Sequence, residues 1–98
     1  MYRSISMPEF DQELKKDIQV IDVRERDEFA NGHVPKAINK PLSELATQIT
    51  DMDDEAEYYI ICQSGGRSAQ ACAYLADQGF DVINVMGGTS AYTGHLEQ

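Results

Sequence analysis

Runs of apolar, mostly β-branched or aromatic residues mark the predicted strands of this chain. The clearest runs cover residues 18–23, 58–62 and 82–85, and each begins directly after a charged residue. Such runs are typical of strands that are buried on both faces. Shorter extended segments are expected around Ile5 and at residues 37–39.

Between these runs, apolar residues recur at helical spacing. Helices are predicted at residues 7–16, 25–31 and 68–78, with a further helical stripe starting at Leu42 and a short helix near residues 89–92. Strands that alternate with helices form βαβ units with right-handed crossovers. The pattern therefore predicts an α/β fold with a parallel sheet.

Length and composition narrow the class of protein. The 98 residues suffice for one domain, residues 1–98, and 42% hydrophobic with 26% charged residues is ordinary for a globular fold. A formal net charge of −9 argues against nucleic-acid and membrane partners. Two cysteines form no disulfide framework, the histidines and cysteines show no metal-ligand spacing, and the first residues lack a signal-peptide pattern. A cytoplasmic location with reduced thiols is expected.

Charge is unevenly distributed along the chain. Residues 1–49 carry seven cationic and nine anionic side chains, whereas residues 50–98 carry eight anionic ones and a single cation, Arg67. A lone guanidinium in this acidic half of the chain is consistent with a local anion-binding site. It is equally consistent with a surface arginine that has no functional role. Five carboxylates form an acidic cluster at residues 51–57: Asp51, Asp53, Asp54, Glu55 and Glu57. The cluster is interpreted as a solvated loop, and the alternative is an acidic docking surface.

Cys62 lies between the clearest predicted strand and the clearest predicted helix. Ligand sites in open α/β sheets form outside the carboxyl ends of the strands. The glycines that follow let the chain curl, which turns backbone N–H groups inward beside a positive helix end and lowers the pKa of a thiol held there. The candidate site is the thiol, the arginine and the loop between and after them: Cys62, Gln63, Ser64, Gly65, Gly66, Arg67 and Ser68.

Each cysteine has two interpretations. Cys62 is either a nucleophile for chemistry through a negatively charged sulfur, or a small buried side chain before a glycine turn; the glycines, the arginine and the helix start favour chemistry. Cys72 shares an apolar stripe with Ala69 and Leu75 and is interpreted as a core residue, with a resolving thiol as the alternative.

Four segments, in this order and spacing, resemble the rhodanese family, specifically its stand-alone single-domain members. They are residues 21–25, residues 32–39, the cysteine loop at residues 62–68 and the glycine pair at residues 87–88, and the resemblance extends over essentially the whole chain. It implies a small central parallel β-sheet flanked by helices on both faces. It also implies that Cys62 takes up sulfane sulfur as a persulfide, with no metal or organic cofactor.

The length of the cysteine loop separates two branches of this fold. Cys62 and Arg67 bracket four residues, as in the sulfurtransferase branch, whereas the related cell-cycle phosphatases have one residue more. The resemblance implies a small sulfur anion such as thiosulfate or polysulfide, or a protein persulfide, as donor, and a thiol or cyanide as acceptor. Relatives that use thiosulfate often carry a further cation in the cysteine loop. In this chain residues 63–66 are neutral, which favours polysulfide or a protein persulfide as the donor. Alternatives are a non-catalytic or sulfur-carrier module that docks a partner protein, and an arsenate reductase or phosphatase.

Supporting residues have interpretations of their own. The resemblance suggests that Asp22 and Arg24 order the surroundings of the loop, whereas their chemistry alone favours a structural ion pair. His33 is expected to brace the turn before Pro35 rather than to act as a general base. Tyr92 stands where family members commonly have tryptophan, and it is interpreted, with the other tyrosines near the strands, as a packing residue.

Overall fold

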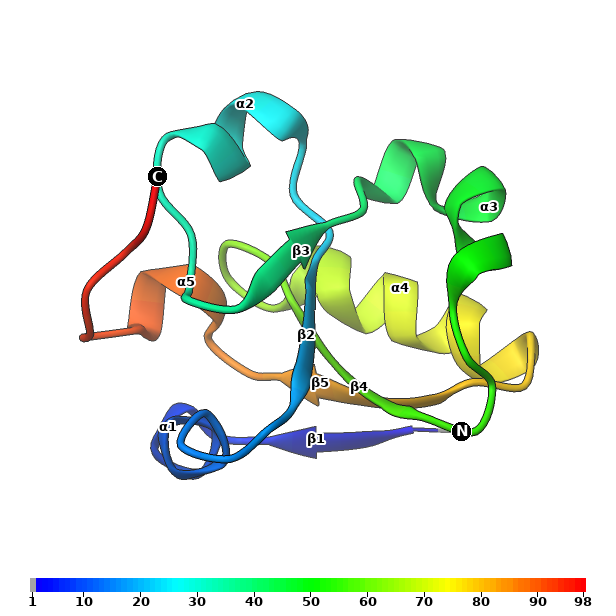
Figure 1. Ribbon diagram of the computed structural model, residues 1–98, viewed down its shortest axis with the longest axis horizontal. Coiled ribbons are helices and arrows are strands. Elements are labelled where there is room, and N and C mark those ends of the chain that lie inside the picture. Colours follow the sequence, from blue (N-terminus) through cyan, green and yellow to red (C-terminus); the bar gives the residue numbers. More distant parts are fainter. Residues whose placement is uncertain (1) are drawn as a thin grey trace.

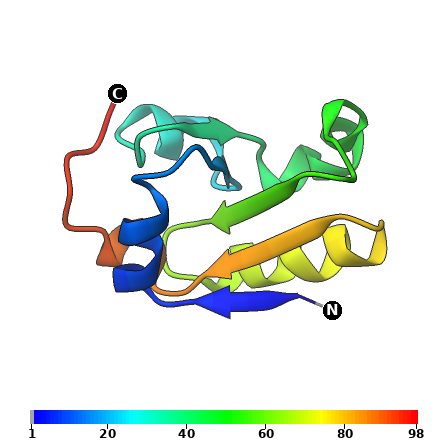
Figure 2. The same ribbon diagram turned by 60° about the horizontal axis from the view of Figure 1, so that its bottom comes forward.

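The computed structural model, which describes residues 2–98, contains one parallel sheet (Figures 1 and 2). Its strands are β1 (Arg3–Ile5), β2 (Gln19–Asp22), β3 (Ala37–Asn39), β4 (Glu57–Ile61) and β5 (Asp81–Val85). They lie in the order β1-β5-β4-β2-β3, and every neighbouring pair is parallel. The predicted α/β class with a small parallel sheet is confirmed.

Five α-helices connect or follow the strands: α1 (Met7–Glu13), α2 (Arg26–Ala30), α3 (Leu45–Gln48), α4 (Gly66–Asp77) and α5 (Gly88–Ala91). The helical stripe predicted from Leu42 is broken, because 3-10 turns at Leu42–Glu44 and Ile49–Asp51 flank the four residues of α3. One local cause is the Thr47 hydroxyl, which donates to the Glu44 carbonyl 2.9 Å away and thereby competes with regular helix bonding.

Two hydrophobic clusters cover the two faces of the sheet. Alternate residues of β4 point to opposite sides, so that Ile60 packs with Leu75 of α4 while Tyr59 packs with Phe10 of α1. The Phe10 and Tyr59 ring centroids are 6.0 Å apart. Helices therefore flank the sheet on both faces, as expected. Across residues 2–98, no helix combines the length and apolarity needed to span a membrane.

Helix α4 begins two residues before its predicted start at residue 68. Gly65 precedes it with φ of +114°, a conformation that favours glycine, and the chain turns there directly into the helix. As a result Arg67 and Ser68 both lie in the first turn of α4. Figure 2 shows β1, β4 and β5 pointing the same way, with the β4–α4 connection and α5 at the tips of the arrows.

Candidate active site

The cysteine loop lies at the carboxyl edge of the sheet and is held there by the start of α5. The Thr89 amide donates to the Cys62 carbonyl at 2.8 Å, and the Ser90 amide donates to the Gln63 carbonyl at 2.9 Å. A side chain at Gly88 would place its Cβ 2.3 Å from the Cys62 carbonyl oxygen, and the φ of this residue is +59°. Only glycine permits this approach, which explains the second glycine of the 87–88 pair.

The thiol of Cys62 lies beneath its own loop and faces hydrogen-bond donors. The Gly65 amide donates to Sγ at 3.0 Å, and the Ser68 hydroxyl oxygen lies 3.3 Å from Sγ. Burial raises the pKa of this thiol, but the Ser68 hydroxyl and the amides of Ser68, Gly65 and Ser64 outweigh it, so that the pKa falls below its ordinary value. The residue is only 1% exposed. The arrangement favours the thiolate form of Cys62.

The Ser68 hydroxyl connects the thiol to a side chain of β5. Its oxygen lies 2.5 Å from Oδ1 of Asn84, which is nearly buried. The hydroxyl donates to this oxygen, and it also lies 3.1 Å from the Gly65 carbonyl oxygen. Because a hydroxyl has a single proton, these two acceptors and the Cys62 sulfur compete for one donor. Sequence reasoning missed Asn84, although an amide inside the apolar run at residues 82–85 was a visible signal.

Replacing Ser68 by alanine removes a hydrogen bond that lowers the pKa of Cys62. We expect the pH midpoint of Cys62 alkylation by iodoacetamide, followed by peptide mass spectrometry, to rise in Ser68→Ala. Ser43→Ala is the matched control, because its hydroxyl donates to Glu25 outside the loop. Equal midpoints in wild type and Ser68→Ala would show that the hydroxyl does not act on the thiol.

Asp22 and Arg24 form a buried ion pair at the end of β2. Asp22 is 0% exposed and Arg24 is 4% exposed, and their closest side-chain contact is 2.8 Å. Arg24 also donates to the Gly32 carbonyl at 2.8 Å and approaches the Gln63 side-chain oxygen at 3.4 Å. The pair thus joins β2 to the turn after α2, and it makes one long contact with the cysteine loop.

The side chain of Arg67 is bound to Glu28, a residue that the sequence did not single out. Both side-chain hydrogen bonds of Arg67 within residues 2–98 go to the Glu28 carboxylate, at 2.6 and 2.9 Å. The bond to Arg67 lowers the pKa of Glu28 to about 2, so this carboxylate is ionised throughout the neutral range. Thirty-nine positions separate the two residues, and nothing in the local sequence of α2 connects them.

The structure also places the other candidate residues. Cys72 is fully buried in the core, and burial raises the pKa of its thiol to about 12, which confirms its interpretation as a core residue. The His33 ring stacks on the Phe29 ring, with their centroids 3.7 Å apart, and its Nδ1 lies 2.9 Å from the Phe29 carbonyl oxygen. The backbone of His33 forms hydrogen bonds with the backbone of Glu97. His33 therefore braces the turn against the C-terminal segment, which Figure 1 shows beside α2.

The acidic cluster lies away from the thiol. Its first four residues precede β4 and its last, Glu57, is the first residue of that strand, whereas Cys62 follows the last residue of the strand. The cluster thus stands at the opposite edge of the sheet, and all five of its residues are exposed. This position agrees with a solvated loop and does not adjoin the candidate site.

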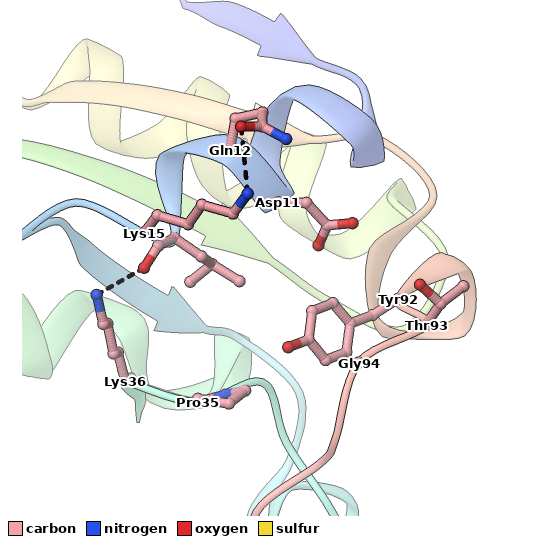
Figure 3. Close-up of a pocket in the computed structure, with 9 residues that line it drawn as sticks. Asp11, Gln12, Lys15, Pro35, Lys36, Tyr92, Thr93 and Gly94 are labelled. Atoms are coloured by element: carbon pink, nitrogen blue, oxygen red, sulfur yellow. Dashed lines mark hydrogen bonds between the residues drawn. The ribbon is translucent and has the colours of Figure 1, made fainter.

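A separate pocket of about 500 Å³ lies between α1, the turn that carries Pro35 and the chain after α5. Figure 3 shows the Tyr92 ring pointing into it, near Asp11 of α1, and Cys62 is not among its lining residues. Tyr92 is half-buried and packs against the α1 side of the core, in agreement with its interpretation. Among residues 2–98, no three His, Cys, Asp or Glu side chains are grouped to hold a metal ion.

The sequence of this chain matches a family profile and several known proteins. A sequence profile described as "Rhodanese-like domain" matches residues 6–95. The chain is 39% identical over 85 residues to the putative sulfurtransferase YtwF of Bacillus subtilis, covering 87% of this chain and 82% of that protein. It is 37% identical over 78 residues to the thiosulfate sulfurtransferase GlpE of Shewanella oneidensis, covering 79% and 77%.

A solved structure extends the agreement to the whole fold. The crystal structure of SSP1007 from Staphylococcus saprophyticus matches with a TM-score of 0.91 and 34% sequence identity, covering 98% of this chain and 99% of that one. The profile match spans nearly all of the chain, including the cysteine loop and the glycine pair. The protein therefore belongs to the rhodanese-like domain family.

Proposed function

We propose that this protein is a sulfurtransferase that carries sulfane sulfur as a persulfide on Cys62. The observation that carries the proposal is the environment of the Cys62 sulfur, which accepts the Gly65 amide at 3.0 Å and lies beside the Ser68 hydroxyl. These donors favour the thiolate, which is the nucleophilic form of cysteine. Sulfurtransferases among its relatives support the same chemistry.

The proposed reaction is a double displacement. The Cys62 thiolate attacks the terminal sulfur of the donor, a new S–S bond forms, and the S–S bond of the donor breaks with its electron pair leaving on the other fragment. With thiosulfate the leaving group is sulfite; with a persulfide it is a thiolate. An acceptor thiolate or cyanide then attacks the outer sulfur of the Cys62 persulfide and regenerates the thiolate. The loop amides stabilise the negative charge in both states.

The near-complete burial of Cys62 supports a slim, terminal sulfur as the group that it attacks. With 1% of the residue exposed, Cys62 leaves little room at Sγ for a bulky reacting group. A single sulfur atom at the end of a donor meets this requirement. A phosphoryl group has oxygens around the reacting phosphorus, and the four residues between Cys62 and Arg67 form a short cradle for it.

Turnover assays with the wild-type protein test this proposal. We expect thiocyanate to form from cyanide with thiosulfate or polysulfide as donor, and we expect no hydrolysis of p-nitrophenyl phosphate and no reduction of arsenate. Turnover of the phosphate ester or of arsenate, without thiocyanate formation from either sulfur donor, would contradict the proposal and favour the phosphatase or reductase alternative.

A further inference from the structure

Both arginines near the thiol are already paired with carboxylates. Arg24 is bound to Asp22 in the interior, and Arg67 holds Glu28 through two hydrogen bonds. The second pair lies at the rim, since the side chains of Arg67 and Glu28 are 36% and 35% exposed. Arg67 is also the single cation in residues 50–98. No other cationic side chain from that half of the chain offsets the charge of an incoming anion.

The position of Arg67 makes its charge relevant to the reaction. It lies in the first turn of α4, one residue before Ser68, whose hydroxyl contacts the Cys62 sulfur. The bond to Glu28 raises the pKa of Arg67 most, and the charge on Cys62 raises it further, so the guanidinium lies within electrostatic reach of the thiolate. A carboxylate bound to this guanidinium cancels much of its attraction for a third group.

Resting on the proposed function, we propose that Glu28 is a specificity-determining residue that masks the charge of Arg67 and thereby disfavours dianionic sulfur donors. Attack of a thiolate on thiosulfate brings three negative charges together, whereas attack on a persulfide brings two. Because like charges repel at this range, a masked arginine penalises the dianion more. The site thus selects a sulfane sulfur carried by a monoanion, such as the persulfide of a small thiol or of a protein.

Glu28 also has a structural contact, which the test must separate from its charge. It occupies the third position of α2, and its Oε1 accepts the Glu25 amide at 3.0 Å. Glutamine has nearly the same shape and keeps an acceptor oxygen for this amide and for Arg67. Glu28→Gln therefore removes the negative charge while preserving a capping hydrogen bond.

The experiment compares two donors that transfer the same sulfur. Thiosulfate is a dianion, and the methanethiosulfonate anion replaces one of its oxygens by a methyl group and carries one negative charge. We expect Glu28→Gln to raise the ratio of kcat/KM for thiosulfate to kcat/KM for methanethiosulfonate by about two- to fivefold, the range of an exposed charge interaction. The ratio comes from one preparation, so it does not depend on the folded fraction.

Glu57→Gln is the matched control, because it makes the same charge change in an exposed glutamate–arginine pair at the opposite edge of the sheet. We expect it to leave the ratio unchanged. An unchanged or lowered ratio in Glu28→Gln, or an equal rise in Glu57→Gln, would overturn the charge-masking proposal while Cys62-dependent transfer continues. If Glu28→Gln does not fold, Glu28→Ala is measured by the same ratio. The proposed function fails separately, if sulfur transfer persists without Cys62.

Discussion

Replacing Cys62 by serine is expected to abolish sulfur transfer, with turnover to thiocyanate falling at least about a thousandfold. A serine hydroxyl stays protonated at neutral pH, and it does not form the sulfur–sulfur bond on which the double displacement depends. Serine has a similar shape and accepts the Gly65 amide, so we expect the fold of the loop to persist. The rate of thiocyanate formation from cyanide and polysulfide is the measurement.

The second cysteine supplies the control for this experiment. Cys72 is fully buried in the core, and the raised pKa of its thiol leaves it protonated at neutral pH. Cys72→Ala is therefore expected to retain turnover even where it lowers stability. If Cys62→Ser keeps a tenth or more of the wild-type rate, Cys62 is not the nucleophile. If Cys72→Ala loses turnover while folded, Cys72 takes part in the reaction as well.

The second large effect is expected on stability, from Asp22→Ala. Its carboxylate accepts hydrogen bonds from the backbone amide, Nε and Nη2 of Arg24 in the interior of the protein. Removing one partner of a buried ion pair leaves an uncompensated charge, which costs about 3–5 kcal/mol. That is a large part of the total stability of a small domain, about 5–15 kcal/mol. Urea unfolding at neutral pH, followed by circular dichroism, measures the loss.

An exposed pair gives the comparison for Asp22. Arg3 and Glu57 contact each other at 2.6 Å, and their side chains are 64% and 43% exposed. Because such pairs contribute little in water, we expect Glu57→Ala to lower the free energy of unfolding by at most about 1 kcal/mol. Equal losses in Asp22→Ala and Glu57→Ala would show that the buried pair does not stabilise the end of β2.

Much of the fold follows from short-range patterns that are visible in the sequence. The apolar runs predicted β2, β4 and β5 to within one residue at each end, because buried strands need continuous apolar side chains. The placement of Cys62 at the carboxyl edge followed from the strand–loop–helix order alone. The segment at residues 42–51 was predicted less well, because local side-chain bonding broke a helix that apolar spacing favoured.

The partners within the site were harder to predict than its location. Glu28 reaches Arg67 only because the turn after β2 and the turn after β4 meet at one edge of the sheet, and no pattern within either segment specifies that pair. Asn84 lies on a neighbouring strand, and its amide reaches the loop through Ser68. Sequence spacing identifies the thiol and the glycine-bearing loop; tertiary contacts determine the charge and the hydrogen bonds around them.

The position of transferred sulfur, after the protein has been treated with polysulfide, shows directly whether Cys62 carries the persulfide. The protein is freed of excess donor, blocked with an alkylating reagent at neutral pH, digested and analysed by mass spectrometry. We expect one additional sulfur atom on the peptide that contains Cys62, and we expect its release as thiocyanate when cyanide is added before blocking. Sulfur found on the Cys72 peptide alone, or no gain on the Cys62 peptide of the folded protein, would contradict this expectation.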